Sequence, residues 1–273
     1  MKKISEPSCN AIVLAADRKP DDVIAQAKGT PCKALAPLAG TPMLCRVIKA
    51  LQATPLIQSI TLAGPDRALL RGVPQIDQQL EAGQLHWLAN ARSPSASAAI
   101  ALAADQSRQP VLLTTADHAL LGTEILDCFI RGGLQQDCDF IVGVARLDTV
   151  MTRFPGTRRT AIRLKDGPFC GCNLFLFATG RGRQLANFWV SVEQQRKRPW
   201  RVIAGALGWA ALLRYACGTL TLEQALQQLS RRLGLKIGAV ILPFAEAAVD
   251  VDTLSDLQLV EQTLAERANT CNA

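Results

Sequence analysis

Short apolar segments alternate with helical patterns through the first half of the chain. The apolar segments are short and flanked by turn residues, as is typical of strands buried on both faces of a sheet. Because parallel strands need crossover connections, this alternation predicts a three-layer α/β/α fold with a mostly parallel, Rossmann-like central sheet. The expected strands lie at 10–16, 60–63, 111–115 and 140–145, and the expected helices at 42–51, 95–105 and 122–132.

The second half of the chain is more helical. Strands are expected at 160–165 and 173–177 around a turn, then nearly continuous helix at 181–236 with breaks near Pro199 and Gly218. A last strand at 239–242 and a helix from Ser255 to about Arg267 complete the prediction, and 17–31 is interpreted as a loop because it lacks periodicity. With no internal repeat and no linker, we expect a single domain over residues 1–273 with a helical insert at about 181–238.

Composition narrows the class of protein. The 273 residues are 49% hydrophobic and 19% charged, which excludes a mainly disordered chain. No run approaches the roughly 18 apolar residues of a membrane-spanning helix, and the N-terminus lacks the apolar core of a signal peptide. The nine cysteines are irregularly spaced, so we expect reduced, mostly buried thiols. Together these features predict a cytoplasmic protein.

The net charge of +7 is compatible with a nucleic acid, an anionic membrane or a small phosphorylated ligand. Only 5% of the residues are aromatic, which supplies few side chains for stacking on bases. We therefore expect no nucleic-acid partner. The sequence leaves the oligomeric state open.

Lys33 lies in a proline-bounded loop beyond the first expected strand. The segment Pro31-Cys-Lys-Ala-Leu-Ala-Pro37 follows the carboxyl end of that strand, where α/β sheets bind ligands. A lysine ammonium at this position can bind a triphosphate through its positive charge. The alternative from the residues alone is a surface lysine without a function.

Three segments together resemble the nucleotidyltransferases with a MobA-like domain. They are A-I-V-L-A-A at 11–16 with P-C-K-A-L-A-P-L-A-G-T-P-M-L at 31–44, V-L-L-T-T-A-D at 111–117, and V-D-V-D-T-L-S-D-L at 249–257. The resemblance covers 10–178 and 239–265 but leaves the helical insert unexplained. It implies the nucleotide-diphospho-sugar transferase type of α/β fold.

The resemblance also implies roles for individual residues. Asp117 and Asp252 would bind Mg²⁺, with Asp250 as a second choice, and Lys33 and Asp117 would be catalytic. Asn173 and Arg163 would contact the acceptor. The nucleotide would lie along Ala15, Ala16, Arg18, Lys19, Lys33 and Ser97.

The implied reaction moves a nucleoside monophosphate from an NTP, with CTP as the candidate, to a small phosphorylated acceptor and releases pyrophosphate. The acceptor oxygen is already anionic, so the site must neutralise charge and align the attack rather than supply a strong base. Two other interpretations stay open: a glycosyltransferase of the same fold that uses a sugar nucleotide, and a non-catalytic nucleotide-binding or scaffold protein.

One segment departs from the family pattern. Most relatives follow the first strand with L-A-A-G-x-G-x-R, whereas this chain has Leu14-Ala-Ala-Asp-Arg-Lys-Pro20 and no glycine before Gly29. Arg18 and Lys19 could replace the backbone amides that glycines expose to phosphate. A loop that no longer binds triphosphate is the alternative.

Several candidate residues also have purely structural interpretations. Ser97 could cap a helix, Asn173 could serve a turn, and Asp250 and Asp252 could mark a helix start. His118 is expected to be a buried structural histidine rather than a ligand. A basic group is expected to be a solvated face unless it holds a phosphorylated substrate: Arg153, Arg158, Arg159, Arg163 and Lys165.

The segment at 193–217 combines a basic cluster containing Trp200 with the apolar stretch 202–217. This combination is typical of a peripheral membrane contact. It is equally typical of a helix that packs on a sheet or on a partner chain, and packing is the favoured interpretation.

Overall fold

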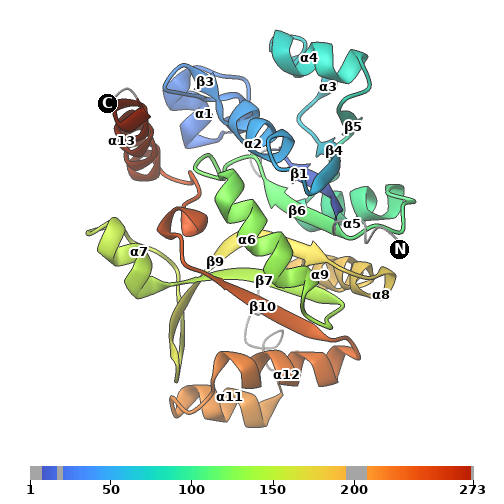
Figure 1. Ribbon diagram of the computed structural model, residues 1–273, viewed down its shortest axis with the longest axis vertical. Helices are drawn as coiled ribbons and strands as arrows, with labels where there is room; N and C mark the ends of the chain where they lie inside the picture. The colour runs from blue at the N-terminus through green and yellow to red at the C-terminus, as the bar shows by residue number, and fades with distance from the viewer. Residues whose placement is uncertain (1–7, 17–20, 195–207, 272–273) are drawn as a thin grey trace, which may run out of the picture.

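The computed structural model describes residues 8–16, 21–194 and 208–271. Helices cover both faces of one central sheet, and the chain crosses between the two layers several times (Figure 1). The strand order is β10-β7-β9-β6-β1-β4-β5, with β8 paired to β9. The predicted three-layer α/β/α fold is therefore confirmed.

One half of the sheet is entirely parallel. β1 (Cys9–Leu14) lies between β4 (Ile57–Ala63) and β6 (Val111–Thr115), and β5 (His86–Leu88) extends the sheet beyond β4. Leu14 is paired with Thr115 and with Ala63, so these three strands end at one edge of the sheet. The positions expected for the first three strands match this half closely.

The other half contains a long antiparallel strand. β9 (Gly167–Phe177) runs antiparallel to both β6 and β7 (Phe140–Arg146), and β10 (Ile237–Leu242) is parallel to β7. β8 (Ile162–Leu164) forms a hairpin with the start of β9. The expected turn at 166–168 lies in this hairpin, but β9 begins at Gly167, well before the predicted strand at 173–177.

Alternate side chains of the strands enter two separate cores. Ala11 and Val13 of β1 face the core built with α2 (Met43–Gln52), α6 (Thr123–Leu134) and α13 (Leu254–Cys271). Ile12 faces the opposite core, built with α5 (Pro94–Ala104), α9 (Leu185–Gln194) and α12 (Leu222–Leu233). This alternation follows from the two-residue period of a strand, and it explains why the strands are apolar on both faces.

Several short elements connect these layers. They are α1 (Val23–Lys28), η1 (Lys33–Leu35), β2 (Pro37–Leu38), β3 (Thr41–Pro42), α3 (Arg67–Leu70), α4 (Pro74–Glu81), α7 (Leu147–Arg153), α8 (Gly180–Arg183), α11 (Trp209–Ala216) and η2 (Ala245–Ala248).

The prediction of a loop throughout 17–31 is wrong, because α1 lies within it. The Asp22 carboxylate accepts hydrogen bonds from the backbone N–H groups of Ile24 and Ala25, and Gly29 ends the helix in the left-handed conformation. The stability of a helix of only six residues depends on such caps. Six residues are too few to show a helical period in the sequence.

The helices at 180–233 connect β9 to β10. The Trp189 ring of α9 packs edge-on against Phe140, Phe175 and Phe177 of the sheet, and α12 covers β10. The expected break at Gly218 is confirmed, while Pro199 and Trp200 lie outside the described residues. No helix in the described ranges is both long and apolar enough to cross a bilayer.

Asp139 ties three elements together where β7 begins. Its carboxylate accepts hydrogen bonds from the Thr179 hydroxyl (2.7 Å) and the Lys236 N–H (2.9 Å), and its residue is 7% exposed. We predict that Asp139→Ala lowers the free energy of unfolding by about 2 kcal/mol, because it leaves both donors without this acceptor. Urea unfolding monitored by circular dichroism measures the change.

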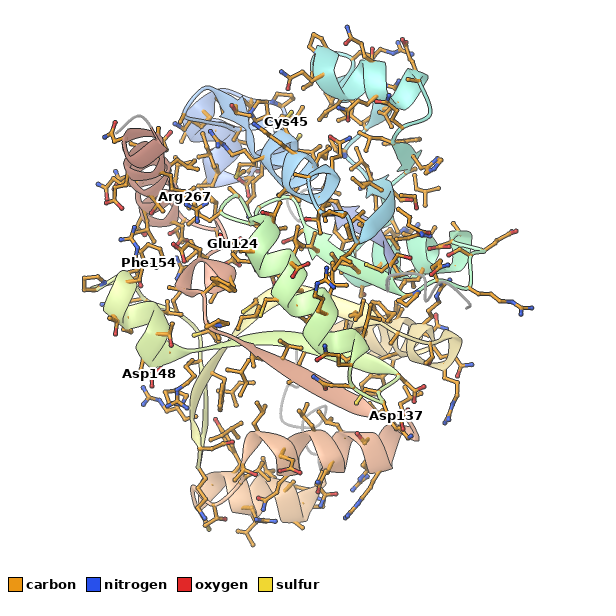
Figure 2. The ribbon with its side chains drawn as sticks, in the orientation of Figure 1. Cys45, Glu124, Asp137, Asp148, Phe154 and Arg267 are labelled. Carbon is orange, nitrogen blue, oxygen red and sulfur yellow. The ribbon has the colours of Figure 1, made fainter. Side chains whose placement is uncertain are left out.

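Asp137 provides the matched control for this substitution. It lies at the same end of the sheet (Figure 2), but its side chain is 95% exposed and its ion pair with Lys236 is at the surface. Asp137→Ala should unfold at the wild-type urea concentration. Equal effects of the two substitutions would contradict the role given to Asp139.

Candidate functional site

β1 and β6 end side by side at one edge of the sheet, and polar side chains gather at this edge. The Ala15 N–H donates to the Ala63 carbonyl and the Ala116 N–H to the Leu14 carbonyl, so the chain segments leaving these strands stay side by side. Gly64 follows β4 with φ of 74°, and a Cβ there would lie 3.0 Å from that of Ala16. The small residues let three strand ends approach closely at the edge where α/β sheets bind ligands.

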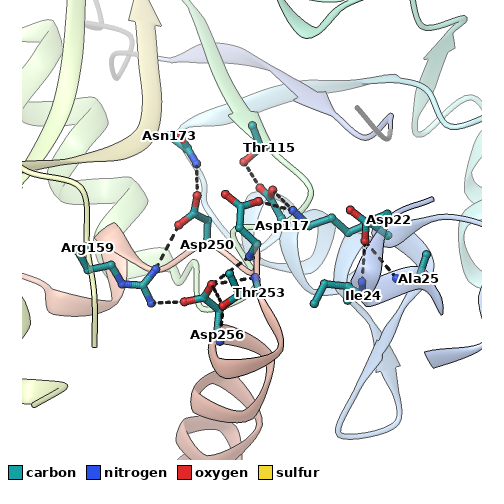
Figure 3. Close-up of polar contacts among 12 residues, drawn as sticks. Asp22, Ile24, Ala25, Thr115, Asp117, Arg159, Asn173, Asp250, Thr253 and Asp256 are labelled. Atoms are coloured by element: carbon teal, nitrogen blue, oxygen red, sulfur yellow. Dashed lines mark hydrogen bonds and ion pairs between the residues drawn. The ribbon is translucent and has the colours of Figure 1, made fainter. Parts of the chain in front are cut away.

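The Lys33 ammonium lies between two carboxylates at this edge. Its Nζ is 2.7 Å from Oδ2 of Asp117 and 2.6 Å from Oδ1 of Asp252, as the dashed lines in Figure 3 show. Lys33 begins η1, Asp117 follows β6, and Asp252 precedes α13. The structure thus brings together the three residues that the sequence motifs singled out.

Burial and charge act in opposite directions on this group. Burial alone would raise the pKa of Asp117, but the Lys33 ammonium and the hydrogen bonds from Lys33 and Thr115 outweigh it, so this pKa is lowered. Burial would likewise lower the pKa of Lys33, and the two carboxylates reverse that effect and raise it. Both side chains are therefore charged at neutral pH.

Two further contacts fix the positions of the carboxylates. The Thr115 hydroxyl donates to Oδ1 of Asp117 at 2.5 Å, leaving Oδ2 for Lys33. The Val251 N–H donates to the Asp117 backbone carbonyl at 3.1 Å, which holds the segment carrying Asp252 against the end of β6. Because these contacts involve no ligand, the arrangement is preorganised.

The two carboxylates have the chemistry of a magnesium site. Mg²⁺ prefers oxygen ligands and is commonly held by one or two carboxylates together with substrate phosphates. Oxygens of Asp117 and Asp252 already converge on one cation, the Lys33 ammonium. Among the described residues no cluster of three or more acidic, histidine or cysteine side chains is arranged for a metal ion. Asp117 and Asp252 are the residues that could hold a metal ion at this edge, because their oxygens lie around one cation.

Asp250 lies in a neighbouring network rather than beside Lys33. It accepts a hydrogen bond from the Asn173 amide at 3.2 Å and pairs with Arg159 at 3.4 Å (Figure 3). Burial, together with the negative charges of Asp117 and Asp252, raises the pKa of Asp250. Its carboxylate links β9 to the segment before α13.

Arg159 also anchors the start of α13. Its guanidinium is 2.9 Å from Asp256, and its side chain is only 7% exposed. Asp256 in turn accepts from the Thr253 N–H while its own N–H donates to the Thr253 hydroxyl, a reciprocal cap. The helix-start interpretation of Asp250 and Asp252 is therefore wrong, because Thr253 and Asp256 do the capping.

Four residues of the expected basic face are exposed, Arg153, Arg158, Arg163 and Lys165, whereas Arg159 does not belong to it. Arg159 is buried in the acidic network, and Arg153 pairs with Glu266 of α13 at 2.6 Å. Arg163 lies exposed on β8, and the structure shows no hydrogen bond or ion pair between it and another described residue. Arg163 is thus not brought to the Lys33 site by any contact within the chain.

Asn173 lies in a strand and not in a turn. The segment 170–173 belongs to β9, whose pairing with β7 shifts register between Val142 and Val144. Asn173 adopts φ of 48° beside this irregularity. Its amide donates to Asp250, so the structural interpretation of Asn173 as a turn residue is wrong, while its expected contact with the acceptor stays a prediction.

Ser97 and His118 are both buried. Ser93 caps α5, so Ser97 is not the cap, and its hydroxyl instead accepts the Ala91 N–H at 2.9 Å. His118 is 1% exposed beside the backbone of η2, and burial lowers its pKa to about 4. It is neutral at physiological pH, in keeping with the structural interpretation. Arg18 and Lys19 lie outside the described residues.

Thr115 and the buried position of Arg159 were not predicted from the sequence. Thr115 carried a usable signal, because residues two apart in an extended segment point to the same side and Asp117 follows it at that spacing. Arg159 carried none, since nothing in its local sequence distinguishes it from Arg158.

We predict that Arg159→Gln lowers the free energy of unfolding by about 2 kcal/mol, because it leaves two largely buried carboxylates without their cation. Hydrogen exchange should also quicken at the first turn of α13. Arg158→Gln, an exposed neighbour, is the control and should change neither measurement. Equal exchange rates in both variants would contradict the anchoring role.

Comparison with solved structures finds transferases. A hypothetical transferase from Thermus thermophilus is 30% identical with a TM-score of 0.76, covering 92% of this chain and 99% of its own. CMP:2-keto-3-deoxy-manno-octonic acid synthetase complexed with CTP is 13% identical with a TM-score of 0.57, covering 95% and 100%. The 4-diphosphocytidyl-2C-methyl-D-erythritol synthase of Anaerococcus prevotii is 13% identical with a TM-score of 0.55, covering 95% and 96%. At 13% identity the last two share the fold alone.

Comparison with curated proteins finds no match. The family described as the MobA-like NTP transferase domain matches residues 11–233. This range contains Lys33 and Asp117 and runs through most of the helical insert, which the sequence resemblance had left unexplained. It ends before Asp252. Since the match spans most of the sequence, the chain belongs to the MobA-like NTP transferase domain family.

Proposed function

We propose that this protein is a Mg²⁺-dependent nucleotidyltransferase that moves a nucleoside monophosphate from an NTP to a small phosphorylated acceptor. The observation that supports it best is the Lys33 ammonium shared by Asp117 and Asp252. Three distant chain segments converge there at the ligand-binding edge of a nucleotide-binding fold. Family membership gives independent support for the nucleotidyl transfer.

In the proposed reaction an acceptor phosphate oxygen attacks the α-phosphorus of the NTP. A new P–O bond forms as the bond to the β-phosphate oxygen breaks, and pyrophosphate leaves with that electron pair. Mg²⁺, when bound, would neutralise phosphate charge. Asp117 and Asp252 would hold it, because their oxygens already converge on a cation.

Lys33 would exchange partners when substrate enters. Its side chain is 12% exposed and its Nζ now contacts two carboxylates. With a divalent cation on those oxygens, the ammonium would turn to the triphosphate, which is also anionic. Thr115 would keep Asp117 in place throughout, since its hydrogen bond uses the other oxygen.

CTP is the nucleotide we propose. The support is analogy, because the name of one solved relative contains CTP and that of another a diphosphocytidyl group. The base would lie near Ser97, and Arg18 and Lys19 would contact phosphates. The acceptor would lie toward Asn173 and Arg163, on the β9 side of the acidic residues.

We place the reaction in the cytoplasm. The support is the state of two thiols: Cys9 and Cys172 are reduced and fully buried. Burial raises the pKa of Cys9 to about 12, which makes this thiol inert. Reduced, buried thiols are typical of proteins in a reducing compartment.

The proposed reaction predicts pyrophosphate release that requires Mg²⁺, one preferred NTP and one phosphorylated acceptor. Asp117→Asn should lower the rate about 10³-fold, because it removes a charged ligand from the reacting centre. Asp127→Asn, an exposed carboxylate on α6, is the control and should keep wild-type activity. A coupled phosphate assay across the four NTPs and a panel of sugar and alditol phosphates measures the rate.

Two other outcomes identify the rival functions. Release of a nucleoside diphosphate from a sugar nucleotide, without any pyrophosphate from NTPs, would mean a glycosyltransferase. NTP binding by calorimetry without turnover on any acceptor, unchanged by Asp117→Asn, would mean a binding protein. Either result would overturn the proposal.

A further inference from the structure

Helix α11 exposes three of its four large apolar side chains, leaves Leu212 half-buried and buries a small residue. Trp209 is 70% exposed, Leu213 67% and Tyr215 40%, while Ala211 is 1% exposed. Trp209 and Leu213 are four residues apart and share one face. A helix that packs on a core does the reverse, since its large apolar residues supply the buried area.

The position of α11 is consistent with an external role. It lies outside α12, at the far end of the molecule from α13 and the short α1 segment (Figure 1). α9 and α12 already cover this face of the sheet with Trp189, Leu226 and Leu229. The core is therefore complete without the apolar side chains of α11.

The positive charge of the protein is concentrated in the stretch of sequence that contains this helix. Residues 181–238 contain ten basic and two acidic side chains, whereas the remainder of the chain contains 20 basic and 21 acidic. Four of the ten basic residues belong to the segment before Gly208 that the structure does not describe, so they are counted from the sequence and not placed in space. The net charge of +7 thus comes entirely from the insert.

Among the described residues, basic side chains border the apolar face. Arg232 approaches α11 at Gly208, where a Cβ would lie 2.7 Å from its guanidinium. Arg214 of α11 reaches Gln224 of α12 at 2.6 Å, and Arg231 is exposed on α12. Glu223 is the one acidic side chain on these two helices.

We propose that α11 attaches this protein to the surface of an anionic membrane. Tryptophan and tyrosine favour the boundary between lipid headgroups and acyl chains, and Leu213 adds apolar area beside Trp209. Arginines next to such a face gain from the negative potential of anionic lipids. An apolar partner protein would use the same face but gives no reason for the concentration of positive charge.

Co-sedimentation of the full chain with vesicles tests the proposal. Vesicles of phosphatidylcholine and phosphatidylglycerol in equal parts should bind the protein, and vesicles of phosphatidylcholine alone should bind it much less. Added salt should release it, because part of the attraction is electrostatic. Equal binding to both vesicles, or binding to neither, would overturn the proposal.

Two sets of substitutions separate the apolar from the electrostatic part. Trp209→Ser with Leu213→Ser should weaken binding to the anionic vesicles at least about tenfold. Arg231→Glu should weaken it about tenfold and reduce its salt dependence. Ile100→Ser, which changes an exposed apolar residue on α5, is the control and should bind as wild type.

Three results would assign α11 to something else and overturn the membrane role. The first is vesicle binding that survives the double substitution. The second is a change from dimer to monomer in the double variant by analytical ultracentrifugation, which would make this face a contact between copies. The third is binding of a DNA duplex that requires Trp209 and Leu213. Unchanged circular dichroism and urea unfolding of each variant check that it is folded.

Discussion

The shared ion pair of Lys33 organises the polar edge of this fold. Asp117 and Asp252 come from segments 135 positions apart in sequence order, and like charges repel when they are brought together away from water. One ammonium at 2.7 and 2.6 Å neutralises much of that repulsion. The loop after β6 and the segment before α13 can therefore meet at the end of the sheet, where a nucleotide would bind.

The surrounding contacts fix the positions of the side chains in this ion pair. The backbone bond from Val251 to Asp117 sets the separation of the two segments, and Thr115 selects which oxygen of Asp117 faces the ammonium. Arg159 holds Asp250 and the first turn of α13 on the other side. Each of these contacts lies within the chain, so the charges of the site are already oriented when a ligand binds. Such an arrangement lowers the free-energy cost of charge redistribution during phosphoryl transfer. The exposed face of α11 lies apart from this edge, so the proposed membrane attachment would not involve the candidate site.

Apolar segments and short motifs were enough to predict the layers of the sheet and the meeting of Lys33, Asp117 and Asp252. Strands buried on both faces leave a strong local signal, and a family motif specifies residues one by one. The helix α1 depends on two caps rather than on periodicity, and the bulge at Asn173 depends on pairing with β7. The burial of Arg159 depends on partners about 90 residues away, which no local pattern encodes. Tertiary contacts of this kind decide the positions that sequence reasoning missed.

We propose that the Lys33 ammonium occupies the place of a metal ion between two carboxylates that would bind Mg²⁺. The most direct measurement is the Mg²⁺ affinity of the nucleotide-free protein, by isothermal titration calorimetry, for wild type, Lys33→Gln and Lys28→Gln. Lys28 pairs with Glu261 away from the site and is the matched control. The account predicts at least about tenfold tighter Mg²⁺ binding in Lys33→Gln alone, because unopposed carboxylates attract a cation more strongly. Unchanged or weaker Mg²⁺ binding in Lys33→Gln would contradict it.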